Sequence, residues 1–175
     1  MDESGIMEWF SGIHGTPLDA IFVGVSYSAT AGIVWLALGA LLVWKAHRTD
    51  GAAMMLSVIL ALCICDLVLK PIVDRGRPFD ELDLDVLVSL PSTSSFPSGH
   101  AVSAFAGAVS LLIMDRRWGI AALVFAALVA LSRVYICVHW PTDVIAGAVI
   151  GAAVAAIVYY TARRMVSNRT DGAGS

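Results

Sequence analysis

The chain has 175 residues, of which 58% are hydrophobic and only 14% are charged. A soluble domain of this length carries about 25% charged residues, so the composition argues against a soluble globular protein and for one that resides in lipid. The length is that of a single domain. The net charge of −3 says little about partners, because the charged residues are strongly clustered along the chain.

Five apolar runs alternate with polar junctions, and each run is long enough, or nearly so, to cross a hydrocarbon layer about 30 Å thick. We therefore predict an all-α fold, a polytopic membrane helical bundle with five or six transmembrane helices, as a single domain over residues 1–175. The predicted spans are residues 18–44, 51–70, 98–114, 118–138 and 141–162. Residues 71–97 are predicted to form the one long loop, on the extracytoplasmic face.

Residues 1–17 precede the first span and contain the apolar side chains Met7, Trp9, Phe10 and Ile13. These side chains could hold the segment flat on the membrane surface. A partial sixth span is the alternative that remains open. The first 15 residues contain no Lys or Arg, which does not fit the pattern of a cleavable signal peptide.

The basic residues are distributed unevenly among the junctions. Seven of the eleven lie at one set of span ends: Lys45, Arg48, Arg116, Arg117, Arg163, Arg164 and Arg169. The positive-inside rule assigns these ends to the cytoplasm, which places the N-terminus and the long loop on the opposite face. The other four basic residues lie at or near the outer ends and need another explanation: Lys70, Arg75, Arg77 and Arg133.

Polar residues gather at three of the outer ends. The three clusters are Lys70 to Pro78, then Pro97-Ser98-Gly99-His100, and finally Ser132-Arg133 with His139 and Asp143. A charge placed beside an apolar span is costly and is therefore a functional candidate by default. On the five-span prediction all three clusters share one membrane face.

The cations of these clusters predict a binding site for a dianion. Lys70, Arg77 and Arg133 supply three positive charges, and guanidinium groups match phosphate oxygens in a two-pronged geometry. Ser98 and Gly99 stand at the predicted start of a helix, where free backbone N–H groups and the helix dipole attract anions. A phosphoryl group is the simplest ligand with these properties.

Two histidines and one carboxylate predict reactivity towards that group. His139 and Asp143 are four residues apart, so on a helix they share a face, and the carboxylate can fix the imidazole tautomer. The other ring nitrogen is then available as a nucleophile. His100, on another span, could protonate the leaving oxygen and later activate water. No carboxylate cluster of metal-binding type accompanies these residues, so no metal site is predicted.

Each of these residues also has a simpler interpretation. A histidine in a membrane helix is often a packing partner, and Arg133 alone could extend to the interface. Asp66 is expected to pair with Lys70 rather than to act in catalysis. The acidic stretch from Asp80 to Asp85 is expected to be a solvated part of the loop. The occurrence of the candidates together on one face is what favours catalysis.

These motifs resemble the three-part signature of the type 2 phosphatidic acid phosphatase superfamily. The matching residues are Lys70 with Arg77-Pro78, then Pro97-Ser98-Gly99-His100, and Ser132-Arg133 with His139 and Asp143. The resemblance implies a metal-independent membrane phosphatase, with His139 as nucleophile aided by Asp143 and His100 as general acid and base. It also implies which residues surround the phosphate: Lys70, Arg77, Ser98, Gly99 and Arg133.

The resemblance also suggests a substrate. Ser95-Phe96, Val134-Tyr135 and Trp140 to Val144 are similar to bacterial members that act on undecaprenyl diphosphate, which we expect to be hydrolysed to undecaprenyl phosphate. The alternatives are phosphatidylglycerophosphate or phosphatidic acid and, in another class, a non-catalytic protein that binds or transports a lipid phosphate. The expected partners are the lipid substrate and the bilayer, without nucleic acid or cofactor, and the oligomeric state stays open. The expected location is the cell membrane, with the site on the extracytoplasmic face.

Overall fold

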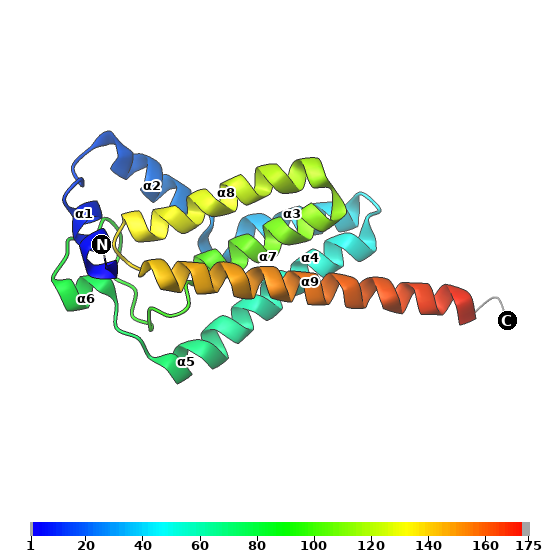
Figure 1. Cartoon of the computed structure of the whole chain (residues 1–175). Coiled ribbons are helices and arrows are strands. Elements are labelled where there is room, and N and C mark those ends of the chain that lie inside the picture. Colours follow the sequence, from blue (N-terminus) through cyan, green and yellow to red (C-terminus); the bar gives the residue numbers. More distant parts are fainter. Residues whose placement is uncertain (1, 173–175) are drawn as a thin grey trace.

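The computed structural model describes the backbone of residues 2–172 and the side chains of residues 2–165. Within this part of the chain every regular element is a helix, which confirms the predicted all-α fold. The helices form an elongated bundle, with α9 (Pro141–Gly172) running along its length (Figure 1). Arg169, counted among the basic residues of the predicted cytoplasmic tail, lies outside the described side chains.

The predicted spans appear as helices with slightly different ends. The first consists of α2 (Pro17–Ser28), the short turn η1 (Thr30–Gly32) and α3 (Ile33–Trp44). The second consists of α4 (Arg48–Cys63), the π-helical segment η2 (Ile64–Leu69) and α5 (Lys70–Val73). The others are α7 (Gly99–Met114), α8 (Arg116–Tyr135) and α9. By length and composition, four of the helices in the described chain can cross a membrane, and α7 is a shorter apolar helix.

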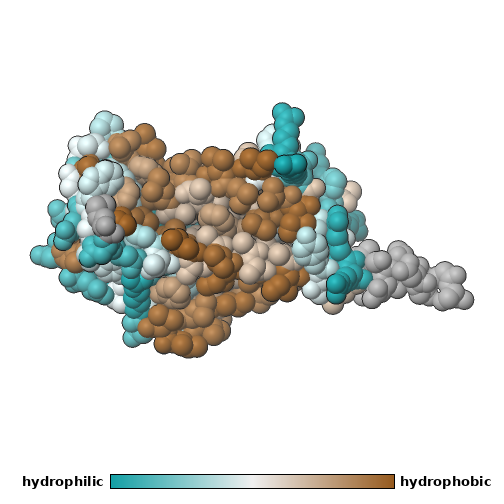
Figure 2. All heavy atoms as spheres, in the orientation of Figure 1, coloured by the Kyte–Doolittle hydropathy of each residue, from teal (hydrophilic) through white to brown (hydrophobic). Residues whose placement is uncertain are grey.

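The surface of the molecule has the polarity of a membrane protein. Apolar side chains cover its middle, and polar side chains cover both ends (Figure 2). Large apolar residues in this belt are strongly exposed, among them Leu67, Val124, Val149 and Ile157. Such a broad apolar surface is stable only in contact with lipid, so the chain is a multi-pass membrane protein.

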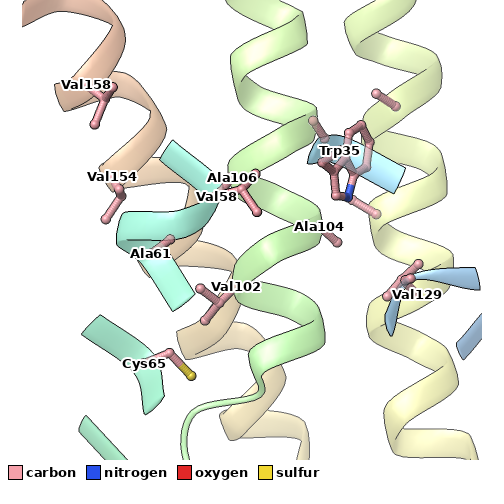
Figure 3. Close-up of a cluster of buried hydrophobic side chains, with 14 of the residues drawn as sticks. Trp35, Val58, Ala61, Cys65, Val102, Ala104, Ala106, Val129, Val154 and Val158 are labelled. Atoms are coloured by element: carbon pink, nitrogen blue, oxygen red, sulfur yellow. The ribbon is translucent and has the colours of Figure 1, made fainter. Parts of the chain in front are cut away.

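The short helix α7 lies at the centre of the bundle and packs mainly against α8 and α9. Its residues Val102 and Ala106 lie among side chains from α4 and α9 (Figure 3). Gly147 and Gly151 of α9 contact the α7 backbone so closely that a Cβ atom at either position would overlap a carbonyl, that of Ser98 or of Val102. The absence of a side chain at both positions therefore lets the backbones of α7 and α9 approach closely.

A kink in the first span brings it against the N-terminal half of α7. Ala31 and Gly32 have positive φ angles of 52° and 68°, which breaks the helix between α2 and α3. A Cβ atom on Gly32 would meet the Val58 side chain at 2.8 Å, so both the backbone conformation and the packing favour glycine here. On the N-terminal side of the kink, α2 packs against α8, and η1 itself contacts α7.

The N-terminal segment, expected to lie on the membrane surface, packs largely on protein. Its helix α1 (Glu3–Ser11) contacts α8 and the short helix α6 (Pro78–Leu82) of the long loop. Met7 is fully buried, and Phe10 packs edge-on against Tyr135, whereas Trp9 stays exposed. The sequence pattern alone could not tell whether this helix contacts the membrane surface or the protein, because an apolar helix face can pack against either. The helix therefore lies at the same end of the bundle as the predicted site.

Candidate active site

A cavity of about 260 Å³ lies where the three polar clusters meet, at one end of the apolar belt. It is lined by six of the eight predicted site residues: Lys70, Arg77, Gly99, His100, Arg133 and His139. The other two, Ser98 and Asp143, do not line the cavity and are fully buried. The structure therefore brings three cations and two histidines around one space large enough for a phosphoryl group.

Lys70 reaches the cavity from the C-terminal end of the second span. Its Nζ atom lies 2.7 Å from Asp66 Oδ1, so the expected pairing of these residues one helical turn apart is confirmed. Nζ also lies 3.4 Å from Thr93 Oγ1, in the loop. The carboxylate of Asp66 is half exposed, and it holds the ammonium group at the cavity wall.

Arg77 is a cation fixed mainly by backbone carbonyls. Its Nε donates to Thr93 O at 2.8 Å, its Nη1 to Val138 O at 2.7 Å and its Nη2 to Ser94 O at 3.3 Å. These bonds tie the long loop to the turn between α8 and α9. Because the partners are neutral carbonyls, the positive charge is held in place without being neutralised.

Arg133 lies in the last turn of α8 and is only 6% exposed. Its Nη1 contacts Ser26 Oγ of α2, while its Nε has no hydrogen-bond partner within the described part of the chain. An unmatched N–H on a buried guanidinium is costly. Arg133 also lines the cavity, so its guanidinium group can meet an anionic ligand there.

The N-terminus of α7 forms another part of the cavity wall. Gly99 is the first residue of the helix, and a Cβ atom there would have no neighbour closer than 3.9 Å. The backbone of this turn is therefore open to a ligand at the positive end of the helix dipole. Ser98 is the N-cap residue, and its backbone N–H donates to Asp143 O at 3.1 Å.

His139 lies in the turn between α8 and α9, with one ring nitrogen committed to a backbone carbonyl. Its Nδ1 atom is 2.8 Å from Ser95 O. Because a carbonyl only accepts, Nδ1 carries the proton and Nε2 is the unprotonated nitrogen. The carboxylate of Asp143 is farther away, with Oδ2 3.7 Å from Nδ1. The sequence led us to expect a direct hydrogen bond from His139 Nδ1 to Asp143. In the structure the backbone carbonyl of Ser95 accepts that hydrogen bond instead.

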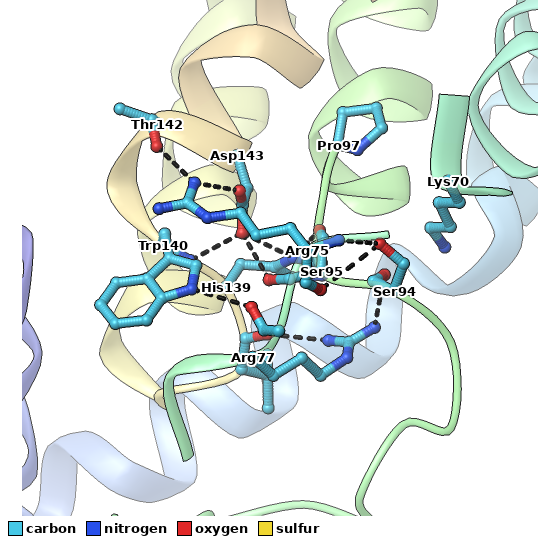
Figure 4. A network of polar contacts seen from close by, with 12 residues as sticks. Lys70, Arg75, Arg77, Ser94, Ser95, Pro97, His139, Trp140, Thr142 and Asp143 are labelled. Carbon is cyan, nitrogen blue, oxygen red and sulfur yellow. Dashed lines mark hydrogen bonds and ion pairs between the residues drawn. The ribbon is translucent and has the colours of Figure 1, made fainter. Parts of the chain in front are cut away.

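Asp143 instead organises the residues around His139 (Figure 4). Its Oδ2 accepts hydrogen bonds from Ser95 Oγ at 2.5 Å and from the Trp140 backbone N–H at 2.9 Å. Its Oδ1 accepts from Arg75 Nη1 at 2.7 Å. Sequence reasoning missed Ser95 and Arg75 as parts of the site. The only signal for Arg75 was its position as a basic residue at an outer end of the second span.

The described residues contain no group of three or more His, Cys, Asp or Glu side chains placed to hold a metal ion. Lys70, Arg77 and Arg133 supply positive charge at the cavity, and the carboxylate of Asp66 lines it beside Lys70. The three cations can stabilise a transferring phosphoryl group directly. The donor set therefore fits a phosphate ligand better than a cation.

Comparison with known proteins agrees with this chemistry. Residues 50–166 match the PAP2 superfamily. The chain belongs to this superfamily. An undecaprenyl-diphosphatase of Sulfolobus acidocaldarius is 38% identical over 122 residues, which cover 68% of this chain and 59% of that relative.

Two further relatives are named for other lipids. A decaprenylphosphoryl-5-phosphoribose phosphatase of Mycobacterium tuberculosis is 37% identical over 142 residues, or 77% of this chain and 75% of that one. The crystal structure of a phosphatidylglycerolphosphate phosphatase from Bacillus subtilis has a TM-score of 0.78 at 27% identity, covering 93% of this chain and 85% of that one. Family and relatives make the chain a lipid phosphatase, while the lipids named for these relatives differ.

The protonation state of His139 gives a direct test of this geometry. Burial lowers the pKa of His139 to about 4, against the opposing charge of Asp143, so the ring is neutral at every pH well above that value. We predict that ¹⁵N NMR of histidine-labelled protein in detergent, assigned with a His139→Gln variant, shows a neutral ring protonated on Nδ1 from pH 8 down to about pH 5. A midpoint near the ordinary histidine value of about 6.5, or an Nε2–H tautomer, would contradict the site as described.

Proposed function

We propose that this PAP2 protein is a metal-independent phosphatase that transfers a phosphoryl group from a membrane lipid to His139 and then to water. The observation that carries the proposal is the single cavity lined by Lys70, Arg77, Arg133, His100 and His139. The cations bind the phosphoryl oxygens, and the free amides at the start of α7 add further donors.

In the first step Nε2 of His139 attacks phosphorus and the bond from phosphorus to the leaving oxygen breaks. The electron pair goes to the leaving oxygen, which takes a proton from His100. Ser95 O holds the proton of His139 on Nδ1, and this bond stabilises the positive charge that develops on the ring as it is phosphorylated. In the second step His100 accepts a proton from water, whose oxygen attacks phosphorus. The phosphorus–nitrogen bond then breaks and inorganic phosphate is released.

The proposed substrate is undecaprenyl diphosphate, with phosphatidylglycerophosphate or phosphatidic acid as the alternative. The named activity of the 38% identical relative supports the diphosphate. A second cavity of about 200 Å³ shares His100 and Arg133 with the first and is also lined by Ser26, Tyr27 and Thr30. It lies beside the proposed general acid, where the leaving group must be, so it can receive the leaving part of the lipid.

Phosphate release by the purified protein in detergent tests the proposed reaction and its substrate together. We expect turnover with excess chelator, and a higher kcat/KM for undecaprenyl diphosphate than for phosphatidic acid or phosphatidylglycerophosphate. The His139→Ala variant is the matched control for contaminating phosphatases. Activity that chelator abolishes and magnesium restores would refute the metal-independent site. A preference for the diacyl phosphates would refute the substrate and retain the chemistry, and lipid binding without turnover would favour a binding or transport protein.

We further propose that the cavity opens on the extracytoplasmic face. The support is charge asymmetry, because basic residues such as Lys45, Arg48, Arg116 and Arg117 lie at the ends of the spans remote from the cavity. Cytoplasmic loops of membrane proteins carry an excess of Lys and Arg, and this bias sets the overall orientation. A lipid phosphate presented on the outer leaflet could then enter the site without crossing the membrane.

Cysteine labelling on intact cells tests this orientation. Asp85 and Arg117 are exposed at opposite ends of the molecule, and each is replaced by cysteine in a background that lacks Cys63, Cys65 and Cys137. An impermeant thiol reagent should label the Asp85→Cys protein and should label the Arg117→Cys protein only after the cells are opened. The reverse pattern would place the site on the cytoplasmic face.

A further inference from the structure

We propose that Arg75 and Glu3 are a pair of positioning residues that hold Asp143, and through it His139, in the reactive arrangement. Neither belongs to the three motifs that carry the superfamily resemblance, and neither lines the cavity. The pair makes the N-terminal helix α1 part of the catalytic apparatus. This inference rests on the proposed role of His139 as the nucleophile.

The Arg75 side chain contacts three elements at once. Nη1 donates to Asp143 Oδ1 and to Thr142 Oγ1, both at 2.7 Å, while Nη2 donates to Glu3 Oε2 at 2.7 Å. The guanidinium also lies over the Trp140 ring, 5.1 Å from its centroid. Its plane is therefore fixed by two carboxylates and one aromatic face, which only a forked, planar cation can satisfy together.

Glu3 completes the arrangement from the N-terminal helix. Its Oε1 accepts hydrogen bonds from the Thr142 backbone N–H at 2.9 Å and from Thr142 Oγ1 at 2.8 Å. The backbone N–H lies in the first turn of α9, where it has no partner within the helix, so Glu3 provides an acceptor at a helix start. Although burial raises the pKa of Glu3, the hydrogen bonds from Thr142 and Arg75 lower it overall. Glu3 is therefore charged at neutral pH.

Asp143 needs such a counter-ion because its side chain is fully buried. A buried carboxylate without a compensating charge is strongly unfavourable. Among the Lys and Arg side chains that the structure describes, Arg75 forms the ion pair with Asp143. The Arg75 side chain is 28% exposed, whereas the Asp143 side chain is not exposed at all. The guanidinium group therefore lies between Asp143 and the surface of the protein.

The contacts form a continuous chain that ends on the proposed nucleophile. Glu3 holds Arg75, Arg75 holds Asp143, and Asp143 accepts from Ser95 Oγ. The carbonyl of the same Ser95 accepts the proton of His139 Nδ1. Loss of Arg75 would therefore disturb the tautomer and direction of His139, while the phosphate-binding cations at the cavity would remain. The consequence is a loss of kcat with little change in KM.

The competing interpretation is that the Arg75 and Glu3 pair only fastens α1 to the protein. A partly exposed ion pair contributes little to stability. Its loss would at most lower the melting temperature, without a selective effect on the chemical step. The two interpretations differ in the phosphorylation rate of correctly folded protein.

The test compares purified Arg75→Ala protein with wild type. Both proteins are assayed with whichever of undecaprenyl diphosphate and phosphatidic acid the wild type hydrolyses faster. We expect kcat and the single-turnover rate of His139 phosphorylation to fall about 100-fold, with KM within a few-fold. Added guanidinium or ethylguanidinium ion should restore part of the rate, because the small cation can occupy the vacated site beside Asp143. Arg117→Ala is the matched control, because it removes an exposed arginine at the other end of the molecule. Its phosphorylation rate should equal that of the wild type, with and without added guanidinium.

The contribution of α1 is tested by Glu3→Gln, with Glu8→Gln on the exposed side of the same helix as its matched control. Glu3→Gln should slow phosphorylation less than Arg75→Ala does, and the double variant should be no slower than Arg75→Ala alone. Should Arg75→Ala fail to fold in detergent, Arg75→Lys provides the same test. It keeps a charge but cannot reach both carboxylates, so it should show an intermediate rate.

Folded Arg75 variants with wild-type phosphorylation rates would overturn the inference, as would additive effects of the Glu3 and Arg75 changes or a loss that guanidinium does not rescue. Failure of the proposed function is a different outcome. In that case wild type itself would release no phosphate, or His139→Ala would remain active.

Discussion

The geometry of the site depends on the buried carboxylate of Asp143. One of its oxygens accepts from the Trp140 backbone N–H at the start of α9 and from Ser95 Oγ, and the other accepts from Arg75. A buried charge tolerates few arrangements of its partners, because each lost hydrogen bond costs far more than it would in water. Asp143 therefore fixes the turn that carries His139 and the loop residue, Ser95, whose carbonyl bonds to His139 Nδ1.

The cations around the cavity are held in a way that suits phosphoryl transfer. Arg77 is bonded to backbone carbonyls, and Arg133 retains an unmatched Nε within the described chain. Donors that are already oriented need no reorganisation when charge develops on the transferring group, and a low-dielectric surrounding strengthens their effect. The cavity lies where α5, α7 and α8 end or begin, between Lys70, Gly99 and Arg133, and the proposed lipid substrate would bring its phosphate to these groups.

Much of this arrangement could be predicted from the sequence. The charge-free runs predicted the spans, and the uneven basic residues placed the three polar clusters at one end of the bundle. That placement accounts for the meeting of Lys70, Gly99, Arg133 and His139 at one cavity. The Arg75–Asp143 contact joins residues 68 positions apart, and the bond to His139 comes from a backbone carbonyl, which no residue type encodes. The packing of α1 was equally hidden, since an apolar face such as that of Met7 fits lipid and protein alike.

The central claim is that the cations and histidines of this cavity transfer a phosphoryl group to His139 itself. Rapid acid-free quench of the protein with substrate labelled on the transferred phosphate, followed by peptide mapping, tests it most directly. The account predicts acid-labile, base-stable phosphate on His139, formed at least as fast as turnover and absent from the His139→Ala variant. Turnover by the wild type without any such species within a single turnover would contradict it, and so would label that persists when His139 is replaced.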